Sequence, residues 1–484
     1  MFTNETLSVS FGADSSRDIL RGLAQMFYMV SPQETTFEEP EEVPKYFRQA
    51  WPYFLAFLIV ENVLLWMEEK TLIRFNDGIT SLSHGLFLEC GRLVFRGAEN
   101  VAYIFIYENF RLVELPWDSA WTWYLAVVGV DFCYYWLHRA CHEVHILWAQ
   151  HQVHHSSEEF NLTVGLRQSI LQGWCGFGVR EYTIANFGPV HVSVVLPATS
   201  SDHPPCTLPH APAVQPPVPV LDPHQECPHL GSSRVGVQHP ETPQGCNLYC
   251  LDKNYGGLLI IWDRLFGTFA DERPKEEIIY GLVYNQPSFN PFFLQIFYNM
   301  NVINKWKSMS NWQDKLAAVW KGPSWIPGKP RLGADEDKLD IKSRDKYNVQ
   351  LPLWCNLYLL IHFVVVVIGF QELALRYMGM SPLAVLGFVA YILTSLTTIG
   401  MLFDNHPYAC LFELVRCLAF VWYVHVFGLN NDPAISILQR ENKNENTECQ
   451  GDPARMTSSC GRCAGAKTWV KRCPVLITCL STPS

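Results

Sequence analysis

The sequence predicts an all-α fold, a polytopic membrane helical bundle. Of its 484 residues, 49% are hydrophobic and only 17% are charged, whereas about a quarter of the residues of an ordinary soluble protein are charged. Leu351–Phe370 and Leu383–Phe403 are each long enough to cross a bilayer as a helix, and neither contains Asp, Glu, Lys or Arg. The formal charge of −10 argues against a nucleic-acid-binding surface. A wholly soluble protein is excluded, and the expected partner is a membrane.

Other apolar segments extend the predicted bundle to five or six spans. The stretch Lys305–Lys346 holds ten Lys and Arg residues, so the bias of basic residues toward the cytosol places it on the cytoplasmic side. No secretory signal is visible ahead of the first apolar segment, which fits a multi-pass protein of the endoplasmic reticulum membrane. The further spans are Trp51–Trp66, Ser81–Leu115, Ser119–Leu137 and roughly 408–429.

Two regions differ in composition from the rest of the chain. Pro204–Pro243 holds eleven of the 31 prolines, which excludes helix, and it shows neither helical nor strand periodicity. Residues 430–484 are polar and carry five cysteines. Cys460 and Cys463 have the spacing that can begin a zinc site, but no second pair follows at finger spacing. We interpret this tail as disordered.

Five histidines form the densest chemical feature of the sequence. Residues four apart share a face of a helix, so the first two can converge on one point, and the next three repeat that geometry. Imidazoles at such spacing suit zinc, copper or non-haem iron. The spacing is H-x3-H, eight residues, then H-x2-H-H, at His138, His142, His151, His154 and His155.

A metal site explains this cluster better than the alternatives. A single histidine beside a membrane helix is usually a hydrogen-bonded interfacial residue, but six histidines within eighteen positions, five of them at ligand spacing, favour a ligand set. The zinc-protease motif starts correctly at His142-Glu143 but has Ile146 where its second histidine is required. Glu143 and Asp131 are candidate catalytic residues, because a carboxylate here can ligate a metal or orient a histidine. Their alternative role is a helix-end charge or a salt bridge.

The two histidine groups, together with the motif Cys250–Phe269, resemble the fatty acid hydroxylase superfamily. Its members are membrane-embedded, histidine-rich di-iron oxygenases that include sterol desaturases and methylsterol oxidases. The resemblance covers roughly residues 45–190 and 246–429. Within this superfamily the sequence is most similar to the pterin-dependent branch that cleaves ether lipids. This similarity lies in the segments Phe75–Leu82, His154–Glu158 and Lys321–Gly333.

This resemblance implies a di-iron monooxygenase at the cytoplasmic edge of the membrane, with the five histidines as iron ligands. It implies an ether-lipid substrate, an alkylglycerol, that is cleaved to an aldehyde and glycerol, and tetrahydrobiopterin as the source of reducing equivalents. Insertion of oxygen beside an ether oxygen requires activation of O2, which two irons can support. No pterin-binding motif is readable in the sequence, so this cofactor rests on the resemblance alone.

The sequence departs from the family where a third box, H-x2-HH, should precede Tyr249-Cys250. Residues 233–244 hold no such box. A shift of the reading frame by one base, with permitted codons, can change the translated sequence of this region. The codons of Val214–Gln225 can then give FNLLYQFWIHT, and those of Leu230–Gln244 can give LGPLEWVFNTPRHHR. These are apolar, family-like peptides, and the second ends at the start of the missing box. We interpret residues of about 190–245 as a frame-shifted translation of a metal-binding segment.

Two alternative functions stay open at this stage. One is another lipid hydroxylation, of a sterol or a fatty acyl chain, and the other is a non-catalytic or impaired isoform that lacks the third box. The oligomeric state is not readable. The expected organisation is a polar segment at 1–50, membrane helices with the first two boxes at 51–190, the Pro-rich replacement at 191–245, the end of the hydroxylase domain at 246–270, a cytoplasmic segment at 271–350, C-terminal membrane helices at 351–429 and the tail at 430–484.

Overall fold

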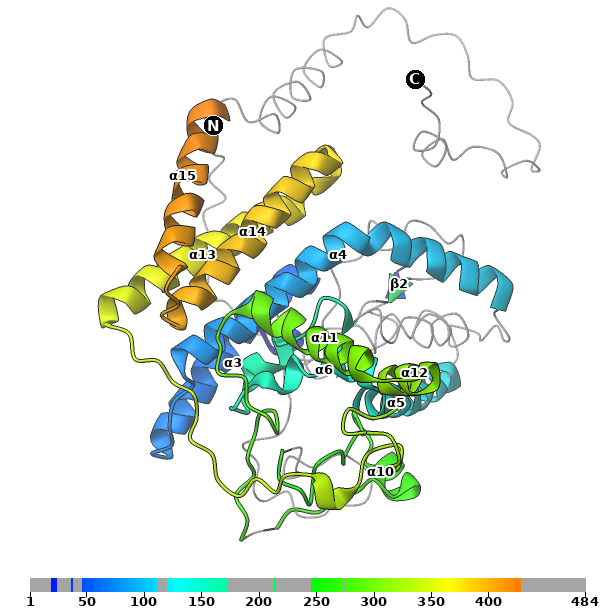
Figure 1. Cartoon of the computed structure of the whole chain (residues 1–484). Coiled ribbons are helices and arrows are strands. Elements are labelled where there is room, and N and C mark those ends of the chain that lie inside the picture. The colour runs from blue at the N-terminus through cyan, green and yellow to red at the C-terminus, as the bar shows by residue number, and fades with distance from the viewer. Residues whose placement is uncertain are drawn as a thin grey trace, which may run out of the picture. The chain divides into compact units, whose positions relative to one another are not determined.

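The computed structural model describes residues 19–23, 36–37, 46–110, 120–172, 213–214, 245–273 and 275–427. Most of the Pro-rich replacement, the third-box region and the tail after residue 427 lie outside these residues. Helices dominate the described part, so the helical fold class is confirmed (Figure 1). The exception is a two-residue antiparallel pairing between β1, Thr36–Phe37, and β2, Ala213–Val214.

The long helices match the apolar segments of the sequence, with shifted ends. They are α3 (Tyr46–Met67), α4 (Phe75–Phe110), α5 (Ala120–Glu143), α13 (Leu353–Arg376), α14 (Pro382–Phe403) and α15 (Ala409–Phe427). The short elements between them are α6 (His145–His151), η2 (His154–Ser156), η3 (Leu162–Leu166), α10 (Ile261–Phe266), α11 (Pro291–Ser308), α12 (Trp312–Trp320), η4 (Asp335–Asp337) and η5 (Tyr377–Gly379).

Two helices in the described part are long and apolar enough to cross a membrane, at Leu353–Gly379 and Pro382–Phe403. Pro52–Met67 is a shorter apolar helix. A membrane protein is therefore supported, while the five or six spans and the polytopic bundle stay predictions. The remaining long helices α4, α5 and α15 carry acidic or basic residues within their apolar stretches, such as Glu89, Asp131 and Glu413.

The main apolar core lies where α4 packs against α13 and α14. Its fully buried members include Phe87 of α4 and Leu396 and Phe403 of α14. Gly400 of α14 is a close-approach position, because a Cβ atom there would lie 2.4 Å from the carbonyl oxygen of Phe289. The end of α14 is thereby held against the chain that leads into α11, and Asp404 accepts a 2.7 Å hydrogen bond from the backbone N–H of Phe289.

A polar cluster joins α15 to α13 and α14. Arg416 donates to Glu413 Oε2 at 2.8 Å, and its Nη2 lies 2.7 Å from His362 Nδ1 of α13. Its Nη1 donates to the hydroxyl of Tyr391 of α14 at 3.3 Å. Ionisable residues within membrane helices are expected to face one another rather than lipid. This cluster follows that rule, while the outward residues of α15 up to Val421 are almost all apolar.

The segment 271–350 contains more structure than its polar composition suggests. Two helices, α11 and α12, lie within it, and α11 runs alongside α6 (Figure 1). Each is capped as its sequence allows. The side chain of Asn290 accepts from the N–H of Phe293 at the start of α11, with Pro291 at the first helical position, and Asn311 caps α12 in the same way.

Candidate metal centre

One extended residue folds the two histidine groups onto each other. Val144 has φ −124° and ψ 118°, which ends α5 after Glu143 and starts α6 at His145. Because the chain turns here, α6 packs back against α5. His145 fixes the start of α6, since its backbone N–H donates to Lys321 O at 2.9 Å and its Nδ1 lies 2.7 Å from Ala318 O.

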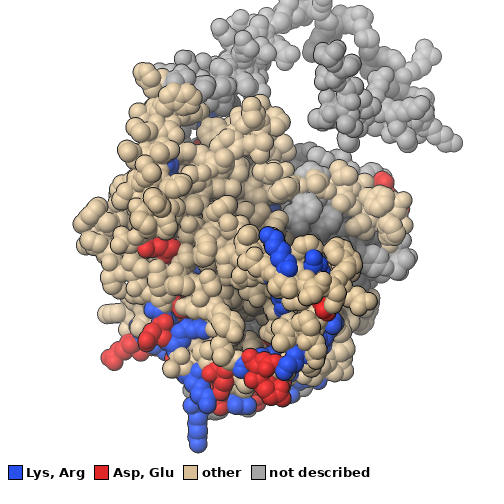
Figure 2. Space-filling model, in the orientation of Figure 1, with Lys and Arg blue, Asp and Glu red and all other residues tan. Residues whose placement is uncertain are grey.

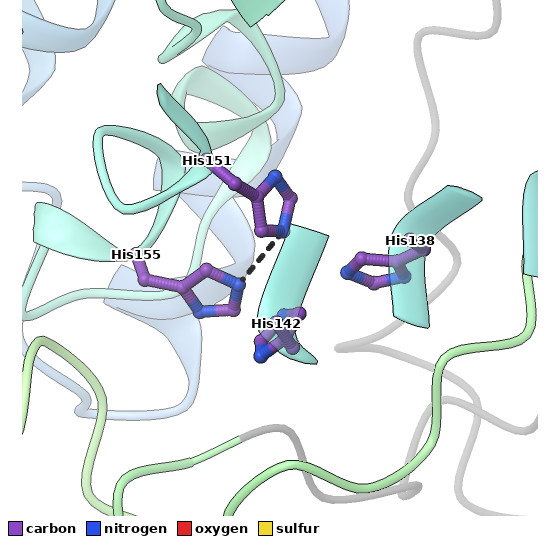
Figure 3. Close-up of side chains that lie close together, drawn as sticks. All are labelled: His138, His142, His151 and His155. Carbon is purple, nitrogen blue, oxygen red and sulfur yellow. Dashed lines mark hydrogen bonds between the residues drawn. The ribbon is translucent and has the colours of Figure 1, made fainter. Parts of the chain in front are cut away.

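Four of the five predicted ligands meet in one group. One ligand nitrogen from each of His138, His142, His151 and His155 lies within 4.8 Å of the other three. The rings converge on a common space (Figure 3), and the Nε2 atoms of His151 and His155 are 3.2 Å apart. Two nitrogens on one ion lie at most about 4.2 Å apart, since a metal–imidazole bond is about 2.1 Å long for an ion such as zinc. Side-chain shifts of a few tenths of an ångström therefore bring the four nitrogens onto one ion. A donor set of imidazoles fits iron, copper or zinc.

In the first histidine box, His138 and His142 form hydrogen bonds through Nδ1, which leaves their Nε2 atoms free to bind a metal. His138 Nδ1 lies 2.9 Å from the backbone oxygen of Tyr255, so Nδ1 carries the proton and Nε2 carries a lone pair. That Nε2 atom is buried and has no hydrogen-bond partner in the described part of the chain. His142 Nδ1 lies 3.1 Å from Asp252 Oδ1. Such outer partners fix the tautomer and orientation of metal-ligating histidines.

His151 is held in a comparable way by Gln172. The amide Nε2 of Gln172 lies 3.2 Å from His151 Nδ1, while Gln172 Oε1 is buried without a partner among the described residues. The two ends of a glutamine amide exchange by a simple flip. In the flipped form Oε1 accepts the Nδ1 proton of His151, which leaves His151 Nε2 free to bind a metal.

Burial keeps the cluster in its metal-binding form. Desolvation, reinforced by the neighbouring imidazoles, lowers the pKa of His151 and of His155 well below the usual value. Burial likewise lowers the pKa of His154 to about 4. A histidine whose pKa lies far below 7 is neutral at physiological pH and presents a lone pair. The residues present therefore fit a bound transition metal.

His154 lies beside the group of four rather than in it. Its ring centroid is 5.3 Å from that of His155 and 5.7 Å from that of His151. Its Nδ1 faces Gln168 Nε2 at 3.5 Å. The second box is split between the end of α6 and the 3-10 turn η2, so its histidines do not follow one continuous helix face as the spacing alone predicted.

The two candidate carboxylates are both engaged in polar contacts. Asp131 accepts hydrogen bonds from the N–H groups of Leu258 and Leu259 at 2.7 and 3.1 Å, and from Trp262 Nε1 at 2.8 Å. It therefore ties the 250–269 motif to α5. Glu143 pairs with Arg139 one turn earlier, at 2.7 Å.

Sequence reasoning did not single out Asp252 and Tyr255 as site residues. Both lie in the motif that carries the family resemblance. Asp263 of the same motif accepts hydrogen bonds from the N–H groups of Tyr255 and Gly256 at 2.8 and 2.7 Å. This carboxylate therefore fixes the loop whose carbonyl orients His138.

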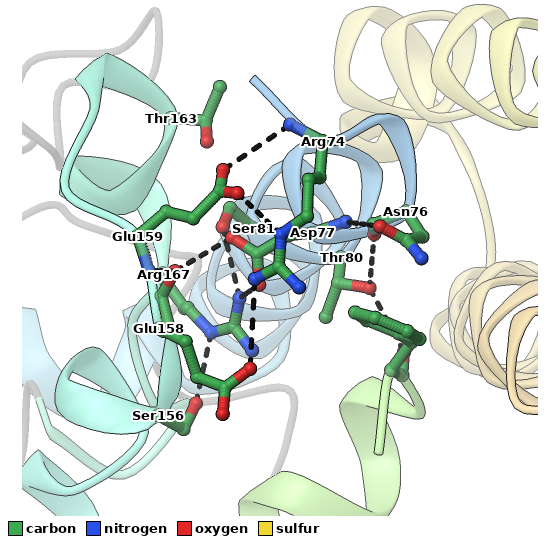
Figure 4. A network of polar contacts seen from close by, with 12 residues as sticks. Arg74, Asn76, Asp77, Thr80, Ser81, Ser156, Glu158, Glu159, Thr163 and Arg167 are labelled. Carbon is green, nitrogen blue, oxygen red and sulfur yellow. Dashed lines mark hydrogen bonds and ion pairs between the residues drawn. The ribbon is translucent and has the colours of Figure 1, made fainter. Parts of the chain in front are cut away.

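A buried polar network anchors the chain that follows the second box (Figure 4). Arg167 Nη1 pairs with Asp77 Oδ1 at 2.8 Å, and these side chains are only 1% and 3% exposed. Arg167 Nε donates to Ser156 Oγ at 2.9 Å, and Ser157 Oγ donates to Asp77 Oδ2 at 2.7 Å. Because Ser156 and Ser157 directly follow His155, the ion pair fixes the second box against α4.

We expect Arg167→Met to lower the free energy of unfolding by about 3–5 kcal/mol, because it leaves the Asp77 carboxylate buried without its partner. Thermal or denaturant unfolding of the purified protein in detergent measures this loss. The control is Glu276→Gln, which removes an ion pair with Arg273. The side chains of Glu276 and Arg273 are 48% and 56% exposed, so this variant should lower the free energy of unfolding by less than about 1 kcal/mol. Equal losses in the two variants would contradict a special role for the buried pair.

Comparison with known families identifies the class of protein. Residues 123–268, which contain all five predicted ligands, match the family model "Fatty acid hydroxylase". Residues 355–438 match "Alkylglycerol monooxygenase C-terminal domain". No solved structure matches the chain. With its apolar helices and buried histidine cluster, the protein is a membrane oxidoreductase of the fatty acid hydroxylase type that acts on lipids.

Whole-chain relatives narrow the assignment. The chain is 38% identical over 417 residues to alkylglycerol monooxygenase of Xenopus tropicalis, covering 85% of this chain and 89% of the relative. It is 38% identical to that of Danio rerio, with the same coverage. Identity to the Homo sapiens protein is 36%, over 84% of this chain and 89% of the relative. The chain belongs to the alkylglycerol monooxygenase family.

Proposed function

We propose that this protein cleaves the ether bond of alkylglycerols by inserting one oxygen atom from O2 at the carbon next to the ether oxygen. The second oxygen atom leaves as water, with two electrons and two protons from a reductant, which we propose to be tetrahydrobiopterin. The hydroxylated product is a hemiacetal, which breaks down to an aldehyde and glycerol. The observation that carries the proposal is the buried group of four histidines in a chain whose relatives bear this activity in their names.

Iron fits the donor set, and when bound it would supply the redox chemistry for O2 activation. His138, His142, His151 and His155 would hold one iron, and His154 would serve a second iron beside it. Tyr255 and Asp252 orient the first two ligands through their Nδ1 atoms. We assign Asp131 and Glu143 supporting roles, because the contacts of Asp131 hold the 250–269 motif on α5 and Glu143, paired with Arg139, ends α5 directly after His142.

We also propose that the protein is a multi-pass protein of the endoplasmic reticulum membrane, with the histidine cluster at the cytoplasmic edge. The basic residues of the segment 305–346 favour that orientation. The cluster lies largely on α5 and α6, and α6 packs against α12, which lies in this basic segment, and against α11, whose last turn enters it.

The chain as given lacks the third histidine box of the family, and we propose that it gains the activity when the frame of residues 190–245 is restored. The missing box favours an impaired isoform as the second candidate function for the unrestored chain. Hydroxylation of a sterol or a fatty acyl chain is the alternative reaction, and the names of the relatives favour the ether lipid over it.

The reaction is tested with membranes that contain the frame-restored protein. We expect aldehyde release from a 1-O-alkylglycerol to require both O2 and a tetrahydropterin, and we expect no hydroxylated product from a sterol or from a diacyl lipid of matched chain length. Mass spectrometry of the products under 18O2 distinguishes these outcomes, because label in the aldehyde precursor reports oxygen insertion. Hydroxylated sterol or fatty acid as the main product would replace the ether-cleaving assignment with the alternative reaction.

A further inference from the structure

Helix α11 has an apolar stripe that faces away from the protein. Five residues spaced along one side of this helix are large, apolar and 39–51% exposed, whereas its fully buried neighbour Leu294 is 0% exposed. At 100° per residue the five fall within one face about 100° wide, which is the width of the core-facing stripe of an amphipathic helix. They are Phe292, Phe293, Ile296, Met300 and Ile303.

The buried side of α11 is mainly apolar, at Leu294, Phe297 and Val302, and the polar side chains of Gln295 and Asn299 hold segments next to the histidine cluster. Gln295 is 7% exposed, accepts from the N–H of Ile170 at 3.0 Å and donates to Gln168 O at 3.1 Å. Asn299 Oδ1 accepts from Gln150 Nε2 at 2.6 Å, on the residue before His151. A surface helix in water shows a polar side outward, whereas α11 is apolar on its buried side and again along its exposed stripe, which indicates an apolar environment outside.

The start of α11 lies at the end of a membrane-spanning helix. A Cβ atom at Gly400 would lie 2.6 Å from Asn290 Cα and 2.7 Å from Pro291 Cδ. Ser288 and Phe289, just before α11, donate to Asp404, the residue after α14. Because α14 is a candidate span from Pro382 to Phe403, its end marks one boundary of the bilayer. The first turn of α11 is therefore at the level of that boundary.

The other end of α11 carries the residues that favour lipid headgroups. Lys307 is exposed in the last turn, and Lys315 Nζ of α12 lies 4.7 Å from the ring centroid of Trp306. Trp and Lys are the residues that anchor helices at the membrane–water interface. In Figure 2 most charged side chains gather on the lower part of this face, and a few blue Lys or Arg side chains lie higher, in the region of α11 and α12.

We propose that α11 lies in the lipid–water interface, with the stripe Phe292–Ile303 among the acyl chains of the membrane. Since α11 also holds α6 through Gln150 and Gln152, it keeps the histidine cluster at the surface where a lipid substrate resides. The proposal rests on the membrane assignment of α14 and is independent of which lipid is oxidised.

The test uses the full chain in vesicles of phosphatidylcholine that carries a photoreactive diazirine in its acyl chain. After irradiation and digestion, mass spectrometry maps the lipid adducts. We expect adducts in Phe292–Ile303 and in α13, and none in the polar segment Asp335–Asp340. Adducts in α13 without any in α11 would overturn the proposal. With photo-methionine at Met300 in place of the labelled lipid, cross-links between the α11 stripes of two chains would also overturn it, and would assign the stripe to a second copy.

A matched pair of variants separates lipid contact from general exposure. Ile296→Asp places a charge in the stripe, and Leu339→Asp places one at a residue of the polar segment with similar exposure, 43% against 46%. We expect Ile296→Asp to reduce the α11 adducts to the level of the segment 335–340 and to leave those of α13 unchanged. Leu339→Asp should change neither. Retained α11 adducts in Ile296→Asp would contradict the proposed depth of the helix, whatever the enzymatic activity of either variant.

Discussion

Restoring the reading frame across residues 190–245 is expected to raise tetrahydrobiopterin-dependent aldehyde release from an alkylglycerol by more than about 100-fold. Loss of even an outer partner of a metal ligand typically costs 10–100-fold in metal affinity or activity, and this chain lacks a whole ligand box. The group of four histidines offers one metal position, and among the described residues His154 belongs to no second group of three or more possible metal ligands.

The replaced segment also conflicts with a membrane location. Eleven prolines lie between Pro204 and Pro243, and proline removes backbone donors and blocks the helix that a lipid environment requires. Both forms should be assayed in membranes at matched expression, together with a restored form that carries His151→Ala as the inactive control. Sequencing the transcript across these codons shows which form the cell makes. Equal activity of the given and restored chains would show that the third box is dispensable.

Replacing any one of the clustered histidines by alanine should remove iron from the frame-restored protein, with a loss of affinity of at least about 100-fold. His138, His142, His151 and His155 share one position, so each supplies a nitrogen that the other three cannot replace. Metal analysis of the purified variants gives the iron content per chain. His406→Ala is the matched control, because His406 is exposed and lies outside the cluster.

The variant His154→Ala distinguishes between the two proposed metal positions. In the frame-restored protein His154→Ala should lower the iron content, because His154 would serve the second iron. In the chain as given the same change should leave the iron held by the group of four. Unchanged iron in all five histidine variants of the restored protein would refute the assignment of the cluster as the metal site, and a thermal melt of each variant confirms that it is folded.

Most helices could be located from the sequence, because the apolar pattern that indicates a helix lies in the helix's own residues. An uninterrupted apolar run of bilayer length gave α14 almost to the residue, while α13 continues past the predicted end at Phe370 to Arg376. The start of α4 was placed too late, at Ser81 instead of Phe75, because its first turn is polar. Asp77 is buried there only through its pairing with Arg167, which lies ninety residues further on. The helices α11 and α12 were not predicted, because the segment 271–350 was interpreted as one polar region, although α11 has no charged residue before Lys305.

The five histidines and their family resemblance were readable from the sequence alone, since ligand spacing on a helix is a local property. Only the tertiary structure decided which four converge, because the turn at Val144 sets how α6 folds back on α5. It also decided what orients them. The partner of His138 Nδ1 is the backbone carbonyl of Tyr255, a group that any residue supplies, so no side chain in the sequence could indicate it.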